Sequence, residues 1–224
     1  YFGDSRALKG ENSSTRLGVS VNLMEMEKPF CDPFRQMLAH RKTMPHLNTI
    51  LGEGWRLDHG PGLIAMEKGC SGGMLHGNFD NAPYFYREGK IFTGLCVIEY
   101  MLADEGPGDG GVSVVPGSHK ANLACPEKMR KWEQYQDFVM EINAKAGDAI
   151  IFSEACTHGT LPWNADHQRR AILYKYNTGH MAWSGGGLHG PVLDYWDELT
   201  PPQQATLIGP SHHSRRPKQS KDYE

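Results

Sequence analysis

Three short segments bring together residue types that bind metal ions and carboxylates. His76 lies in the segment Leu-His-Gly-Asn-Phe-Asp, His158 begins a His-Gly-Thr segment, and Arg169 follows His158 by 11 residues. Two imidazoles and one carboxylate can occupy one face of Fe(II), which leaves open positions for a chelating acid and for oxygen. An arginine suits the far carboxylate of that acid, because its planar guanidinium donates two parallel hydrogen bonds. The spacing therefore predicts a non-haem iron site.

The elements that must position these residues have the pattern of short strands. After Gly60-Pro61-Gly62, apolar runs alternate with Gly-rich or polar turns. This pattern favours a β-sandwich or barrel over a parallel α/β sheet. We expect the long run from Ile91 to Leu102 to be one central strand, because apolar and polar residues alternate poorly along it. The other predicted strands cover residues 63–66, 112–115, 138–142, 149–152 and 171–176.

Helices are predicted at both ends of this β region and at one place within it. Residues 33–51 have helical spacing, and Pro45 must break or restart a helix there, so we expect one or two helices. Residues 126–138 are compatible with a helix, and residues 197–207 form another in which Pro201-Pro202 supplies the first turn. We expect one domain over residues 1–209 and a disordered polar tail over residues 210–224.

Composition excludes several classes of protein. Lys and Arg number 23 against 26 Asp and Glu, so the net charge of −3 offers no basic excess for a nucleic-acid partner. Every apolar run is shorter than the roughly 18 residues that cross a bilayer, which excludes a membrane span. The five cysteines are scattered and form no Cys-x-x-Cys pair, so we expect free thiols. With no secretory leader visible, we expect a cytoplasmic protein.

The chain from about Gly73 to Tyr176 resembles the phytanoyl-CoA dioxygenase family, Fe(II)/2-oxoglutarate oxygenases of double-stranded β-helix fold. The resemblance is carried by three motifs in order: Pro-Gly-Ser-His-Lys at 116–120, Gly-Asp at 147–148, and His-Gly-Thr-Leu-Pro-Trp with its later Arg-Arg pair. It implies a mainly β jelly roll of the cupin-like type with flanking helices. It also implies Fe(II) and 2-oxoglutarate as cofactors, molecular oxygen as co-substrate and a small-molecule substrate.

The family motifs imply a role for each matching residue. His76 would be the first iron ligand and His158 the distal one. Arg169 would bind the 5-carboxylate of 2-oxoglutarate, and Thr160 stands where the family has a hydroxyl that helps to hold it. Side chains alternate along a strand, so Arg170 should point to the other face, and we interpret it as a surface residue.

The sequence departs from the family at the metal-binding carboxylate. The family motif is His-x-Asp, but Asn78 stands at the aspartate position. Asp80 can replace it if the turn-prone chain bends, because an extended strand would place it roughly 13 Å from His76. We take Asp80 as the third metal ligand. Two alternatives stay open: Asn78 coordinates through its side-chain oxygen, or the position is left for a halide, as in relatives that chlorinate.

The leading prediction is an oxygenase that hydroxylates a small molecule, converting 2-oxoglutarate to succinate and carbon dioxide. One alternative is a halogenase that lacks the carboxylate ligand, and another is a non-catalytic jelly-roll binding protein. A zinc hydrolase that uses His76, Asp80 and His158 ranks last, because it gives Arg169 no role. No Lys/Arg patch suits the phosphates of CoA, which favours a small free molecule.

Two further features call for explanation. Glu99 stands in an apolar run, and a buried carboxylate needs a partner, for which we expect Lys175 or Arg170. The aromatic residues Tyr84, Phe85 and Tyr86 follow the first histidine motif; they either line an apolar substrate pocket or belong to the core.

Overall fold

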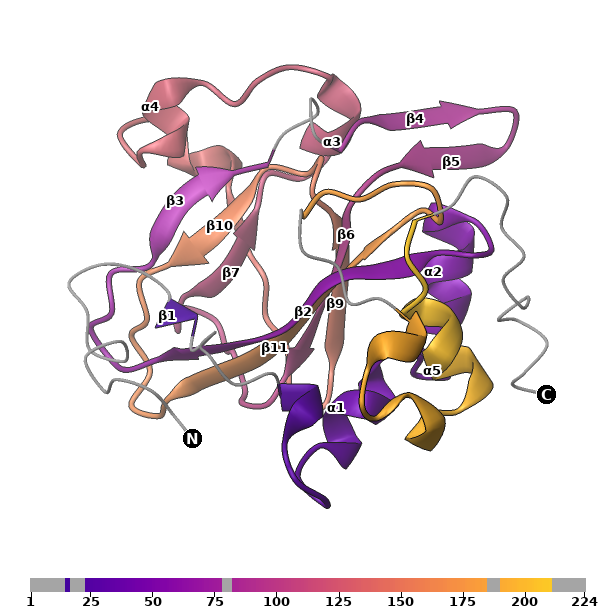
Figure 1. The fold of residues 1–224 in the computed structure, drawn as a ribbon. Helices are drawn as coiled ribbons and strands as arrows, with labels where there is room; N and C mark the ends of the chain where they lie inside the picture. Colours follow the sequence, from indigo (N-terminus) through magenta and orange to yellow (C-terminus); the bar gives the residue numbers. More distant parts are fainter. Residues whose placement is uncertain (1–14, 17–22, 78–81, 185–189, 211–224) are drawn as a thin grey trace.

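Two antiparallel sheets lie face to face in the computed structural model, which describes residues 15–16, 23–77, 82–184 and 190–210 (Figure 1). One sheet runs β1 (Thr15–Arg16), β2 (Arg56–Met66), β11 (Arg169–Asn177), β6 (Cys96–Met101) and β9 (Ala149–Ser153). The other runs β3 (Gly73–His76), β10 (His158–Leu161), β7 (Gly111–Val114) and β8 (Met140–Glu141). A hairpin of β4 (Tyr84–Arg87) and β5 (Lys90–Thr93) lies apart from both. The predicted mainly β jelly roll is confirmed.

Helices flank the five-stranded sheet. They are α1 (Asp32–Met37), α2 (Met44–Leu51) and α5 (Pro201–Thr206), with the short α3 (Ser118–Ala121) and α4 (Glu127–Arg130) elsewhere and 3-10 turns at Leu23–Glu25, Gln136–Phe138, Gly190–Val192 and Trp196–Glu198. Proline occupies the first turn of α1, α2 and α5, where its missing N–H removes no helical hydrogen bond. The helices predicted over residues 33–51 are confirmed as α1 and α2, and Pro45 lies in the first turn of α2. The helix predicted over 197–207 is shorter, because Pro201-Pro202 starts α5 and Trp196–Glu198 forms a separate 3-10 turn.

The side chains of β11 divide between an apolar outer face and a charged inner face. Ile172, Tyr174 and Tyr176 belong to the main apolar cluster with residues of α1 and α2, and the Trp55 ring meets Tyr176 edge-on at 5.1 Å. Because side chains alternate along a strand, Arg169 and Lys175 point the other way, between the two sheets. Both are buried. The interior between the sheets therefore holds charged groups that need partners.

Two of the predicted elements are wrong in extent. The run from Ile91 to Leu102 forms two strands, because the chain leaves β5 through Gly94-Leu95 and enters β6 in a different sheet. The helix expected over residues 126–138 ends after Arg130, where the backbone takes positive φ at Trp132 (61°) and Tyr135 (67°). Left-handed backbone at a non-glycine residue interrupts a helix, which is why only α4 and a 3-10 turn form.

Three further predictions concern the cysteines, a membrane span and the bounds of the domain. All five cysteines are free, as expected. No helix in the described ranges has the length and apolarity to cross a membrane. The expected tail lies, apart from its first residue, outside the described residues, and the single domain over residues 1–209 stays a prediction.

Candidate metal centre

The two predicted metal-binding histidines lie side by side. β3 ends at His76 and β10 begins at His158, and these two residues are direct partners in the antiparallel register. Residues that are directly opposite in such a pair project to the same face of the sheet. The ring centroids are 4.2 Å apart. The sheet pairing therefore brings together two imidazoles that are 82 residues apart in the sequence.

Backbone carbonyls orient both rings. His158 Nδ1 donates to the carbonyl oxygen of Cys156 at 2.7 Å, and His76 Nδ1 donates to that of Met74 at 3.1 Å. With Nδ1 protonated, each neutral ring presents Nε2 as a free lone pair, the usual arrangement for a metal-binding histidine. Burial, with a smaller effect of His76, lowers the pKa of His158 to about 4. The ring is therefore neutral near pH 7, as metal binding requires.

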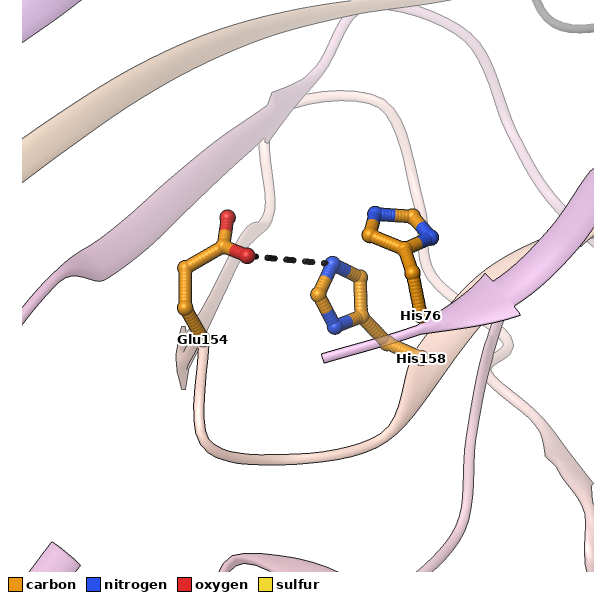
Figure 2. Close-up of side chains that lie close together, drawn as sticks. All are labelled: His76, Glu154 and His158. Atoms are coloured by element: carbon orange, nitrogen blue, oxygen red, sulfur yellow. Dashed lines mark ion pairs between the residues drawn. The ribbon is translucent and has the colours of Figure 1, made fainter. Parts of the chain in front are cut away.

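A carboxylate that the sequence analysis missed faces these histidines. Glu154 follows β9, and its Oε2 lies 3.8 Å from His158 Nε2 (Figure 2). One ligand atom from each of His76, Glu154 and His158 lies within 4.8 Å of the others. Neighbouring ligands about 2.1 Å from one ion, on one face of it, lie about 3 Å apart, so these three side chains would have to move closer together to hold a metal. Two imidazoles and one carboxylate are a donor set that suits Fe(II).

Lys175 holds the other oxygen of this carboxylate. Its Nζ lies 2.5 Å from Glu154 Oε1, and both side chains are largely buried. Burial alone would raise the pKa of Glu154, but its electrostatic interactions with His158 and Lys175 outweigh burial and hold that pKa below its ordinary value. Glu154 is therefore ionised at neutral pH, with one oxygen fixed by Lys175 and the other directed at the histidines (Figure 2).

Glycine is required next to the first histidine. Gly77 has φ of +128°, a backbone conformation that residues with a Cβ rarely adopt. A Cβ there would lie 2.4 Å from the carbonyl oxygen of Cys156, the same oxygen that accepts from His158. The chain can thus pass this close to the metal-binding strand only because position 77 has no side chain.

The predicted third ligand cannot be placed. Asp80 and Asn78 lie outside the described residues, so the choice between them stays a prediction. No motif marks Glu154, because the family motif has its carboxylate near His76. One signal was present: Glu154 lies two residues after the predicted strand 149–152 and precedes His158 by four residues.

The two residues expected to hold 2-oxoglutarate differ in their surroundings. Thr160 lies two residues beyond His158 on β10, so both side chains share a face of the sheet. Arg169 begins β11 and is fully buried: its Nη2 donates to Glu99 Oε1 at 2.8 Å and its Nε to Glu105 Oε1 at 2.5 Å. The prediction that Lys175 or Arg170 pairs with Glu99 is wrong, because Arg169 reaches across from the neighbouring strand. Arg170 is exposed, as expected.

A cleft with aromatic walls lies at the β4–β5 hairpin and α3. Its volume is about 990 Å³, and its lining comes from the β4–β5 hairpin and α3: Tyr84, Phe85, Tyr86, Arg87, Ile91, Phe92, Lys120 and Asn122. In α3, Ser118 Oγ accepts a hydrogen bond from the backbone N–H of Thr157, the residue before His158. The three aromatic residues singled out in the sequence thus line a cleft and lie outside the main apolar cluster.

The jelly-roll fold and the donor set of two imidazoles and one carboxylate fit a non-haem iron enzyme. The sequence matches the family described as phytanoyl-CoA dioxygenase (PhyH) over residues 25–171, about two thirds of the chain, and the chain belongs to that family. Enzymes of the family use Fe(II) and 2-oxoglutarate. No curated protein sequence matches the chain at the significance required.

Solved structures show the same fold. HygX from Streptomyces hygroscopicus, with nickel, 2-oxoglutarate and hygromycin B bound, superposes with a TM-score of 0.58 at 19% identity, covering 66% of each chain. HygX with iron bound gives 0.57 at 19% identity, covering 66% of this chain and 68% of HygX. The epimerase SnoN from nogalamycin biosynthesis gives 0.50 at 17% identity, covering 66% of this chain and 57% of SnoN. At these identities the similarity establishes the fold and leaves the substrate open.

Proposed function

We propose that the protein is an Fe(II)/2-oxoglutarate-dependent oxygenase that hydroxylates a small molecule, with the metal held by His76, Glu154 and His158. The observation that carries the proposal is the convergence of three ligand atoms within 4.8 Å, on strands that the family fold brings together. Membership of the PhyH family supports the cofactors. Asp80, the ligand expected from the sequence, remains the competing carboxylate.

The contacts of Glu154 support it over Asp80. A metal-binding carboxylate is ordinarily itself hydrogen-bonded, and Lys175 supplies that bond. An ionised carboxylate that is largely buried also requires positive partners, and a metal ion beside the two neutral histidines would be one. A carboxylate at this position supports an oxygenase over a halogenase, because the halogenase hypothesis requires the third protein ligand to be missing.

The chain's own residues have separate tasks in this proposal. Iron and 2-oxoglutarate, when bound, supply the oxidising power for attack on an unactivated C–H bond. The protein holds the metal on three side chains, and the Phe152 ring, 4.7 Å from that of His158, shields one side of the site from water. The exposed His76 leaves the opposite side accessible. The aromatic cleft beside α3 is our proposed site for a small, partly apolar substrate, in a reducing cytoplasm that keeps the thiols free.

The test is an anaerobic titration of the metal-free protein with Fe(II) and 2-oxoglutarate. It follows the weak visible charge-transfer band of the ternary complex in wild type, Glu154→Gln and Asp80→Asn. We expect the band in wild type and in Asp80→Asn, and its loss in Glu154→Gln, because glutamine is a neutral and weaker ligand for a hard cation. Circular dichroism of each variant checks that the fold is retained.

The same titration separates the alternatives. Loss of the band in Asp80→Asn alone would return the ligand role to Asp80 and overturn the role of Glu154. Retention of the band in both variants would favour the halogenase, for which chloride binding is the next measurement. If wild type forms no such complex and releases no succinate with oxygen, the protein is a binding protein and the oxygenase proposal fails.

A further inference from the structure

The inner face of β11 carries two cations, and they differ in the number of carboxylates that they contact. Arg169 stands at the beginning of the strand and Lys175 six residues later, about 20 Å along it. The even spacing places both side chains on the face between the sheets. Lys175 reaches the Glu154 carboxylate and so belongs to the metal centre, whereas Arg169 reaches Glu99 and Glu105.

Arg169 already has more negative charge than it can neutralise. One guanidinium faces two carboxylates, those of Glu99 and Glu105, and all three side chains are at most 2% exposed. Glu105 Oε2 also accepts from the backbone N–H of Val112 at 3.2 Å. A carboxylate of a bound acid would be a third negative group in this buried space, where like charges repel strongly and solvent cannot screen them.

Lys175 has hydrogen-bond donors that its contact with Glu154 does not use. Within the described part of the chain its ammonium pairs with Glu154 alone, although an ammonium carries three N–H donors. The side chain is 8% exposed, so its ammonium lies largely away from bulk water. Donors that are buried in this way require an acceptor.

The charge around Lys175 also favours a bound dianion. Both histidines bind a metal in the neutral form, so a divalent ion, the Glu154 carboxylate and the Lys175 ammonium sum to two positive charges. A buried excess of this size needs anionic partners. 2-Oxoglutarate carries two carboxylates and matches it.

We propose that Lys175, and not Arg169, is the cation that binds a carboxylate of 2-oxoglutarate. The inference rests on the proposed function and changes the role that the family motif implies for Arg169. In this assignment, Arg169 with Glu99 and Glu105 is a structural cluster that closes the interior between the sheets. Lys175 serves twice: it orients Glu154, and it supplies the positive charge for the co-substrate.

The test measures binding of 2-oxoglutarate by calorimetry, without oxygen, to protein saturated with Co(II). The variants are Lys175→Met and Lys175→Arg, and Lys145→Met, a change at an exposed lysine, is the matched control. The Co(II) absorption spectrum shows that each sample is fully loaded, which separates loss of the metal from loss of the acid. We expect Lys175→Met to raise the Kd about 10–100-fold, Lys175→Arg to raise it less, and the control to leave it unchanged.

A second acid tells which carboxylate is bound. 2-Oxobutyrate has the chelating end of 2-oxoglutarate but no distal carboxylate. If Lys175→Met weakens both acids equally, Lys175 binds the carboxylate next to the keto group; if it weakens 2-oxoglutarate alone, Lys175 binds the distal one. Both results support the proposal. Where Lys175→Met fails to fold, Lys175→Gln serves as the neutral variant.

Two results would count against the inference, and they are distinguishable. If wild type binds 2-oxoglutarate and the folded, metal-loaded neutral variant binds it within about twofold of wild type, Lys175 is not the carboxylate site and the proposed function stands. If Co(II)-loaded wild type binds no 2-oxoglutarate, the proposed function and this inference both fail.

Discussion

Two buried charged clusters lie between the sheets, and they differ in what their polar atoms face. In the structural cluster of Arg169, Glu99 and Glu105, each side chain hydrogen-bonds to another member of the cluster or to the backbone. In the metal centre, Lys175 and two backbone carbonyls hold the outer atoms of Glu154 and the two histidines. The inner atoms of these three converge on one point.

The difference separates a stabilising cluster from a binding site. A buried charge is retained either because the chain itself satisfies it or because a ligand does. The structural cluster forms its hydrogen bonds within the chain, so removal of a member should cost stability and leave metal binding unchanged. In the proposed metal centre, a bound metal ion and the co-substrate would complete the interactions. Changes in this centre should therefore alter metal and co-substrate affinity first. The predictions below test this division.

The largest effect is expected from Arg169→Ala. The change leaves two buried carboxylates without their cation, which costs about 3–5 kcal/mol in the free energy of unfolding. Urea denaturation of the metal-free protein measures it, with Arg170→Ala as the exposed neighbour that should change stability by less than about 0.5 kcal/mol. Equal stability of the two variants would show that the cluster does not hold the sheets together.

The next effect is a pH dependence of the metal centre. Burial lowers the pKa of His158 to about 4, from 6.5 in the unfolded chain, so the unfolded state takes up this proton first as the pH falls. The free energy of unfolding of the metal-free protein should therefore fall between pH 6.5 and 4, by at most about 3 kcal/mol. Urea midpoints across this range measure it. His158→Gln should flatten the profile and the exposed His46→Gln should not; identical profiles in all three proteins would contradict the assignment.

A glycine lies beside each cluster, so the same substitution, glycine to alanine, can be made at both. A Cβ at Gly77 would lie 2.4 Å from the Cys156 carbonyl oxygen, and one at Gly111 would lie 2.2 Å from Glu105 Oε2. Both positions have positive φ, so each alanine should cost about 1–3 kcal/mol in stability. Only Gly77→Ala should also weaken Co(II) binding, because it displaces the carbonyl that orients His158. Weakened binding in Gly111→Ala as well would mean that the two clusters are coupled.

The smallest effect is expected from Thr160→Val. Valine keeps the shape of the side chain and removes the hydroxyl, so the Kd for 2-oxoglutarate should rise about 2–10-fold. The exposed Thr49→Val is the control for loss of a hydroxyl elsewhere, and calorimetry on Co(II)-loaded protein measures both. An unchanged Kd in Thr160→Val would remove Thr160 from the co-substrate site.

The sequence predicts the structure correctly where one local rule decides where an element begins or which way a side chain points. Pro45 and the Pro201-Pro202 pair mark helix starts, and the alternation of β11 correctly places Arg170 at the surface. The family motif also pointed to His76 and His158, which the structure places side by side.

The features that could not be predicted from the sequence depend on contacts between segments that lie far apart in the chain. That Ile91–Leu102 divides between two sheets follows from which strands become neighbours. Glu154 and Lys175 meet across β9, β6 and β11, and no motif marks either residue. The role of Arg169 with 2-oxoglutarate stays a prediction, but its two carboxylate partners could not be predicted, because they come from residues 64 and 70 positions away in the chain.

The central claim, that Glu154 completes the metal centre, is tested most directly by anomalous diffraction from crystals of the Fe(II)-loaded protein grown without oxygen. We predict one iron peak, about 2.0–2.2 Å from Nε2 of His76, Nε2 of His158 and one carboxylate oxygen of Glu154, whose other oxygen remains on Lys175. Iron coordinated by Asp80 or Asn78, with Glu154 bound to Lys175 alone, would contradict the account.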